Sequence, residues 1–293
     1  MDRREFLASL LATSVVAKTL TWGAETTRKI DRIGLQLYTV RELLKDDLEG
    51  TLAKVAQIGY REVEFAGYFN HSARDLRAIL DGYGLAAPSA HVPYGVLGDK
   101  WASALDEAHT LGHAYIVCPW VDDEIRKMPG GWKRAAETFN RAGEISKKSG
   151  IQFAYHNHNF EFVPVDGKMP YDLLLEETDP NLVKMEMDLC WVNVAGQDPR
   201  KYFDRYPGRF PLVHVKDVKK IPLRDGAGPV PLEKIIPDMT AVGSGVIDWK
   251  QIFAGQRKPA SNTISWRMTP PSHPSIFSSP AILTCATCRC RPL

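Results

Sequence analysis

Short apolar runs alternate with longer amphipathic segments from residue 32 onward. Each apolar run has the length of a strand, and the next segment spaces its apolar residues as a helix does. Gly59 ends the first helical segment, and Ser72 is placed as the N-cap of the second. The expected strands are 33–38, 62–65, 88–92, 114–118, 151–156, 183–188 and 212–216, and the expected helices are 41–58, 72–83, 100–111, 132–148, 171–177, 199–206 and 248–254.

Strands that alternate with helices predict a parallel sheet. Seven such units, with polar residues gathered at the strand ends, favour a (β/α)₈ TIM barrel over an open sheet. We expect one barrel domain over residues 30–256, with the eighth strand and helix lost after about residue 256. No G-x-G-x-x-G motif follows the first strand and no P-loop motif occurs, which removes the main support for nucleotide binding.

The fifth strand ends in a group of imidazole and carboxylate side chains. His156 and His158 point to the same side because side chains alternate along a strand. Glu186 and Asp188 end the sixth strand in the same manner, and residues 214 and 216, His and Lys, end the seventh. The C-terminal strand ends of a parallel barrel meet at its mouth, so these residues predict a metal site there.

Composition narrows the class of partner. The chain has 293 residues, 44% hydrophobic and 25% charged, as in an ordinary globular protein. A net charge of +2 gives no electrostatic case for nucleic acid. No internal run approaches the roughly 20 apolar residues of a membrane-spanning helix. Oligomerisation stays open.

The first 24 residues form a separate unit. Arg3 and Arg4 stand before an apolar stretch, in a pattern that resembles a twin-arginine export signal. An N-terminal helix with two chance arginines is the alternative. An export signal implies a periplasmic or secreted protein that folds around its cofactor before it crosses the membrane. Cys118 and Cys190 stand in apolar runs and are expected to be buried thiols.

Six motifs occur in order on successive units: LQLYTVR (35–41), GYREVEF (59–65), YHNH (155–158), MDLCW (187–191), HVKD (214–217) and VGSGVIDW (242–249). Together they make residues 32–254 resemble the xylose-isomerase-like sugar phosphate isomerase/epimerase family. The resemblance implies a divalent metal held by residues at the ends of strands five to eight. Carried over by position, the metal ligands are His156, Asp188 and His214. Histidine replaces the glutamate of the family at 156, which favours Mn, Zn, Co or Fe over Mg.

The resemblance also implies proton abstraction next to a carbonyl. His158 is the favoured base or acid, Glu161 is second and could instead serve as a strand-five ligand, and Lys216 could stabilise an enediolate oxygen. The alternatives are structural: His158 could only hold a loop, and Glu186 could be a buried partner of a lysine. The candidate substrate-binding residues are Gln36, Tyr38, Glu64, His91, Trp120 and Trp191. Glu64 and His91 could equally be hydrogen-bonded core residues.

The expected function is a metal-dependent isomerase or epimerase acting on an unphosphorylated sugar or polyol. Export argues against a phosphorylated substrate. A 3-keto-glycoside lyase or hydrolase, or an inosose-dehydratase-like lyase, uses the same proton abstraction and remains open. A secreted sugar-binding pseudoenzyme is the alternative from another class.

The composition changes after Gln256, because no acidic residue occurs from Arg257 to Leu293. A reading-frame shift accounts for this, since the alternative frame can encode a strand ending in Val-Glu and a closing helix. The C-x-x-C-x-C pattern that begins at Cys285 then has no function. We therefore expect residues 257–293 to be an aberrant, disordered tail and the chain to be unstable and weakly active or inactive. A stop codon early in the shifted frame would rule the frameshift out.

Overall fold

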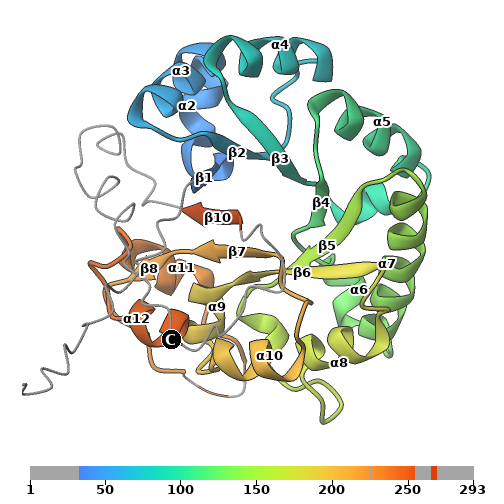
Figure 1. Cartoon of the computed structure of the whole chain (residues 1–293). Helices are drawn as coiled ribbons and strands as arrows, with labels where there is room; N and C mark the ends of the chain where they lie inside the picture. The colour runs from blue at the N-terminus through green and yellow to red at the C-terminus, as the bar shows by residue number, and fades with distance from the viewer. Residues whose placement is uncertain (1–32, 225, 227, 255–264, 269–293) are drawn as a thin grey trace, which may run out of the picture.

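The computed structural model describes residues 33–254, apart from 225 and 227, and residues 265–268. Its centre is a closed barrel of parallel strands in the order β1-β10-β7-β6-β5-β4-β3-β2, with the helices around it (Figure 1). The barrel strands are β1 (Ile33–Gln36), β2 (Glu62–Ala66), β3 (Ala86–His91), β4 (Tyr115–Cys118), β5 (Gln152–His156), β6 (Val183–Asp188), β7 (Leu212–Val215) and β10 (Ser265–Met268).

The helices follow the strands in the expected alternation. The α-helices are α2 (Arg41–Asp46), α3 (Leu48–Ile58), α4 (Ala73–Tyr83), α5 (Trp101–Leu111), α6 (Asp123–Lys127), α7 (Gly131–Lys148), α8 (Pro170–Glu177), α9 (Leu189–Val194), α10 (Pro199–Arg205), α11 (Leu232–Ile235) and α12 (Trp249–Ala254). The 3-10 helices are η1 (Leu37–Val40), η2 (Tyr94–Leu97), η3 (Phe160–Phe162) and η4 (Ile236–Asp238). A small antiparallel pair, β8 (Asp217–Val218) with β9 (Met239–Thr240), lies outside the barrel sheet.

The predicted TIM barrel is confirmed, and among the described residues its eighth unit is incomplete as expected, although not empty. We expected that position to be empty, but β10 pairs with β1 on one side and β7 on the other. Its four residues belong to the segment expected to be a disordered tail. The described part of the eighth unit is this strand, and the rest of that segment lies outside the described residues, as do the proposed export signal and the terminal cysteines.

Local sequence signals set the helix ends. The Ser72 hydroxyl accepts a hydrogen bond from Asp75 N, which confirms this residue as the N-cap of α4. Gly59 ends α3 with φ +115°, a backbone conformation that favours glycine. The expected helix 41–58 is divided in two, because the Asp47 carboxylate accepts from Gly50 N and begins α3 as a new helix.

Apolar side chains pack on both the outer and the inner face of the barrel strands. Outward side chains of β5 such as Phe153 and Tyr155 pack with the helices in the larger core cluster. Inside the barrel, Val117, Ala154 and Leu212 form a small buried cluster. Ala154 and Leu212 each stand two residues before a histidine on the same face of the strand. The interior is therefore apolar below and polar at the C-terminal mouth.

The buried thiols predicted at Cys118 and Cys190 are confirmed, and neither forms a disulfide. Across the part of the chain that the structure describes, no helix combines the length and the apolar character needed to cross a membrane.

Candidate metal centre and active site

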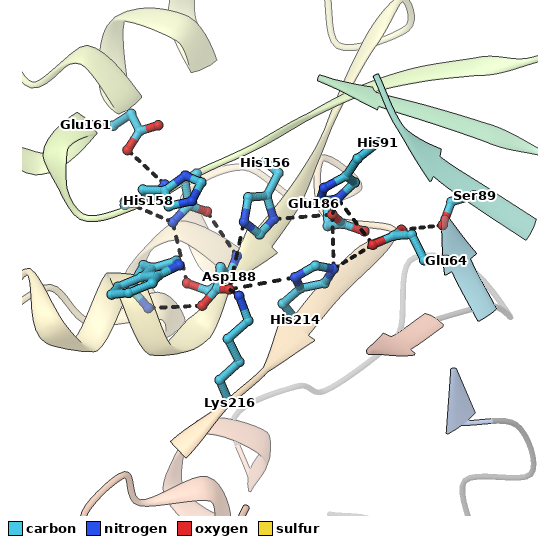
Figure 2. A network of polar contacts seen from close by, with 12 residues as sticks. Glu64, Ser89, His91, His156, His158, Glu161, Glu186, Asp188, His214 and Lys216 are labelled. Carbon is cyan, nitrogen blue, oxygen red and sulfur yellow. Dashed lines mark hydrogen bonds and ion pairs between the residues drawn. The ribbon is translucent and has the colours of Figure 1, made fainter. Parts of the chain in front are cut away.

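Charged and imidazole side chains from five parts of the barrel meet at its mouth. Glu64 comes from β2, His91 from β3, His156 from β5, and His214 from β7. Glu186 and Asp188 both come from β6, as expected from their alternation. Figure 2 shows these side chains turned toward one another. All are nearly or fully buried, with side-chain exposure of 10% or less.

Glu186 Oε2 is the centre of this group. It lies 2.7 Å from His91 Nε2, 3.2 Å from His156 Nδ1 and 3.2 Å from His214 Nε2. One donor atom of each of these four residues lies within 4.8 Å of the others. Glu64 Oε1 closes the group on another side, 2.8 Å from His214 Nε2 and 3.2 Å from His91 Nε2.

Asp188 lies beside this group rather than at its centre. Its Oδ2 is 2.7 Å from Lys216 Nζ, and 3.8 Å and 3.7 Å from ring nitrogens of His156 and His214. Its Oδ1 accepts from Trp191 N at 3.0 Å, which makes Asp188 the N-cap of α9. The predicted metal ligands therefore come together, and Lys216 joins them through Asp188.

The pKa values of the ionisable groups in this cluster shift in different directions. Burial lowers the pKa of His156 to about 4, with the neighbouring His214 acting in the same direction. Burial also opposes charge on His214, but Glu186 and Asp188 outweigh it and raise the His214 pKa well above its usual value. The pKa of Glu186 is lowered well below its usual range, because the imidazoles around it outweigh the cost of burying its charge. The surroundings thus favour ionised Glu186.

His158 stands at the rim, in an aromatic surround. Its ring stacks on Phe160 at a centroid distance of 5.6 Å and meets the edge of Trp120 at 4.9 Å. Trp191 also stacks on it, at a centroid distance of 5.7 Å. His156 and His158 have ring centroids 5.1 Å apart, so His158 directly adjoins the cluster. Neither His158 Nδ1 nor Trp191 Nε1 makes a hydrogen bond with any described residue.

Glu161 is not brought into the cluster. Its carboxylate accepts from the Tyr155 hydroxyl at 2.6 Å and from His158 N at 2.9 Å. Tyr155 lies on the outward face of β5, in the core beneath the helices. Glu161 therefore holds the loop that carries His158, and burial raises the pKa of its carboxyl group to about 7.

This position makes a pH-dependent prediction for Glu161→Gln. Above about pH 4.5 the unfolded chain ionises this group, whereas the folded chain keeps it protonated until about pH 7. The free energy of unfolding should therefore fall by about 3 kcal/mol across that interval through this group alone. Urea titrations at several pH values should show this slope in the parent chain and a shallower one in the glutamine variant. Exposed Glu107→Gln is the control, and parallel curves for the parent and Glu161→Gln would contradict the assignment.

The remaining predicted substrate contacts are spread around the mouth. Gln36 ends β1 beside Glu64, and its side chain accepts from Tyr38 N at 2.5 Å. Tyr38 is 57% exposed and carries the Arg41 guanidinium over its ring. Trp120 likewise lies under a guanidinium, that of Arg126 at 4.6 Å. Within the described residues, none of these three forms a side-chain hydrogen bond with the histidines at the barrel mouth.

Sequence reasoning missed several supporting residues. Asn157 Oδ1 accepts from Asp188 N at 3.0 Å and so ties β5 to β6. Ser89 donates to Glu64. Asp217 binds the loop after β7, since its carboxylate accepts from the backbone of residues 218, 243, 245 and 247 and from Trp249 Nε1. The VGSGVIDW motif supplies most of these donors, and its spacing alone could not identify the acceptor.

The model of one protein family, described as xylose isomerase-like TIM barrel, matches residues 52–271. The chain belongs to this family. An inosose dehydratase of Geobacillus kaustophilus is 30% identical over 237 residues, which cover 69% of this chain and 73% of the relative. An inosose dehydratase of Lacticaseibacillus casei is 25% identical over 192 residues, 59% of this chain and 64% of the relative. The chain thus spans under two thirds of the second relative.

Solved structures share the fold. A protein described as a sugar phosphate isomerase/epimerase from Parabacteroides distasonis is 25% identical, with a TM-score of 0.70 over 92% of this chain and 97% of that one. A structure of IOLI protein with a bound zinc atom is 15% identical, with a TM-score of 0.66 over 86% of this chain and 94% of that one. Both likenesses support the barrel assignment.

The residues of the mouth suit a divalent cation. The Nδ1 atoms of His156 and His214 are buried and make no hydrogen bond within the described part of the chain. Neutral imidazole and carboxylate are the ligands that Zn²⁺, Mn²⁺, Co²⁺ and Fe²⁺ take in proteins. The donor chemistry therefore fits the metal that the sequence predicts.

Proposed function

We propose that this chain is a metal-dependent, sugar-modifying enzyme that removes a proton next to a carbonyl and eliminates water from an unphosphorylated keto-cyclitol or keto-sugar. The observation that carries the proposal is the convergence of three histidines and Glu186 beside the Asp188–Lys216 pair. The relatives named inosose dehydratase favour elimination as the outcome.

The residues around the cluster divide the chemistry among them. A divalent ion bound there would act as a Lewis acid on the carbonyl oxygen. His158, at the rim, accepts the proton from the carbon next to the carbonyl. The electron pair of that C–H bond forms the new double bond. The β-hydroxyl takes the proton back from His158 and leaves as water. Lys216 stabilises the oxygen that gains negative charge.

The surroundings suit a neutral, polyhydroxylated ring. Trp120 and Trp191 offer aromatic faces, which pack well against the C–H face of a sugar. Among the described side chains Lys216 is a cation at the cluster, and Asp188 already pairs with it at 2.7 Å. A phosphate group would compete with that carboxylate. We also propose a periplasmic location, because the first 24 residues resemble an export signal.

Isomerisation or epimerisation is the second candidate. It starts with the same proton abstraction, but the proton returns to carbon and nothing is eliminated. The likeness to the Parabacteroides distasonis protein, described as a sugar phosphate isomerase/epimerase, favours it.

Proton exchange in D₂O tests the proposal. The full chain, loaded with Mn²⁺, Co²⁺ or Zn²⁺, is incubated with inososes and 3-keto-glucosides and followed by NMR. We expect loss of the signal of the proton next to the carbonyl, together with an unsaturated ketone that absorbs in the ultraviolet. Exchange without the unsaturated product would favour the isomerase. Tight binding without exchange would overturn the enzyme and favour a sugar-binding protein.

A further inference from the structure

We propose that the cation is held by His91, His156, Glu186 and His214, so that the site is complete without a carboxylate on the eighth strand. This proposal rests on the metal dependence of the proposed function. It replaces Asp188 of the sequence-based set with Glu186 and adds His91. The four ligands come from β3, β5, β6 and β7.

The first argument is geometric. Three imidazole nitrogens from three strands lie 2.7–3.2 Å from the one oxygen Glu186 Oε2. Donor atoms in a tetrahedral zinc site lie about 3.3 Å apart, which follows from bond lengths near 2.0 Å. The three contacts to Glu186 Oε2 come close to that spacing, and all four donor atoms lie within 4.8 Å of one another. Figure 2 shows the three rings turned toward Glu186 from different sides.

The second argument concerns charge. Glu186 and Asp188 are fully buried carboxylates, and Lys216 Nζ lies 2.7 Å from Asp188 Oδ2. A buried carboxylate is costly unless an opposite charge lies beside it. A divalent cation bound by Glu186 and the imidazoles would supply that charge, which an anion could not.

The third argument separates Asp188 from the ligands. Asp188 uses Oδ1 to cap α9 and Oδ2 to pair with Lys216 at 2.7 Å. Its approaches to the imidazoles, 3.7 and 3.8 Å, are longer than those of Glu186. Asp188 and Lys216 thus remain a pair that faces the substrate side, and Glu186 is the carboxylate that the imidazoles surround.

The fourth argument concerns the eighth strand. Its residues are Ser265, Trp266, Arg267 and Met268, and no acidic residue follows Gln256 in the sequence. A ligand set that needs a carboxylate from this strand could not form in this chain. Three imidazoles and one carboxylate from the other strands form a set that favours Zn²⁺, Co²⁺, Mn²⁺ or Fe²⁺ over Mg²⁺ or Ca²⁺.

Cobalt binding to two matched variants tests the proposal. Glu186→Gln and Asp188→Asn each remove one buried carboxylate charge from the same face of β6 at nearly constant volume. The metal-free full chains are titrated with Co²⁺, and visible absorption, stoichiometry and Kd are measured. We expect Glu186→Gln to raise the Kd at least about a hundredfold and to abolish the cobalt absorption bands. Asp188→Asn should still bind one Co²⁺ per chain, with a Kd within about tenfold of the parent, as expected for a residue next to the ligands.

The opposite result, in which Asp188→Asn loses cobalt and Glu186→Gln retains it, would overturn the proposal. His91→Asn provides a second variant on another strand, in case Glu186→Gln does not fold, and circular dichroism checks the fold of each. Retention of the parent Kd and absorption bands by folded His91→Asn would also overturn it. The readout is metal binding, so a chain that binds cobalt through Glu186 without exchanging substrate protons would refute the proposed function alone.

Discussion

Replacing His214 with alanine should lower the rate of C–H exchange by about a thousandfold or more. His214 belongs both to the ligand set drawn from the sequence and to the set centred on Glu186, so either set loses a ligand. The Lewis acid contributes several kcal/mol of transition-state stabilisation, and each 1.36 kcal/mol corresponds to about tenfold in rate. Exchange in D₂O, measured with the parent and the variant at equal metal concentration, checks this.

His109→Ala is the matched control, because His109 is exposed on α5, outside the barrel mouth. Its exchange rate should equal that of the parent chain. An exchange rate for His214→Ala within about tenfold of the parent would remove the metal-dependent mechanism, since a metal ligand contributes more than this.

Replacing Asp217 with alanine should lower the free energy of unfolding by about 3 to 5 kcal/mol. Four backbone N–H groups and Trp249 Nε1 would lose their acceptor, and a buried donor left unpaired costs about 1 to 3 kcal/mol. The sum is limited because water reaches part of the loop. Such a loss is a large share of the 5 to 15 kcal/mol typical of a folded protein. Urea unfolding followed by tryptophan fluorescence measures it.

Asp248→Ala is the control for this prediction. Asp248 is exposed and accepts one backbone hydrogen bond, from Gln251 N at 2.9 Å, so its loss should cost only about 1 kcal/mol. Equal losses of unfolding free energy for the two substitutions would show that the hydrogen bonds accepted by Asp217 do not stabilise the loop.

Much of the fold could be predicted from the alternation of apolar runs and amphipathic segments. Parallel barrel strands are buried on both faces and bounded by helix caps, so their positions stand out in the sequence. The eighth strand was missed because Ser265 to Met268 lacks the long apolar run that marked the other strands. Its pairing with β1 and β7 comes from the closure of the barrel, a long-range constraint that no local pattern records.

The candidate site could be predicted only in part. Alternation along a strand correctly placed His156, Asp188 and His214 at one mouth. It could not decide which carboxylate of β6 the imidazoles surround, because Glu186 and Asp188 share a face. It also could not show that Glu161, three residues after His158, bonds to Tyr155 on the outward side of the strand. Both distinctions depend on the register between neighbouring strands and on loop geometry.

The structure also changes the argument for an unstable chain. A barrel without its eighth strand would leave open edges at β1 and β7, which is why the sequence predicts instability. In the structure β10 pairs with both of these strands. The shifted reading frame would place Val-Glu in this same region, so a nucleotide sequence would show whether the present strand replaces one that carried a carboxylate.

The apolar cluster of Val117, Ala154 and Leu212 bears on how substrate enters the barrel and how product leaves it. These buried residues lie on the inward faces of β4, β5 and β7, below the level of the histidines, so a reactant should enter through the C-terminal opening. The same opening must then serve as the exit. Product that lingers would block the next arrival, so inhibition by product should be competitive with respect to substrate.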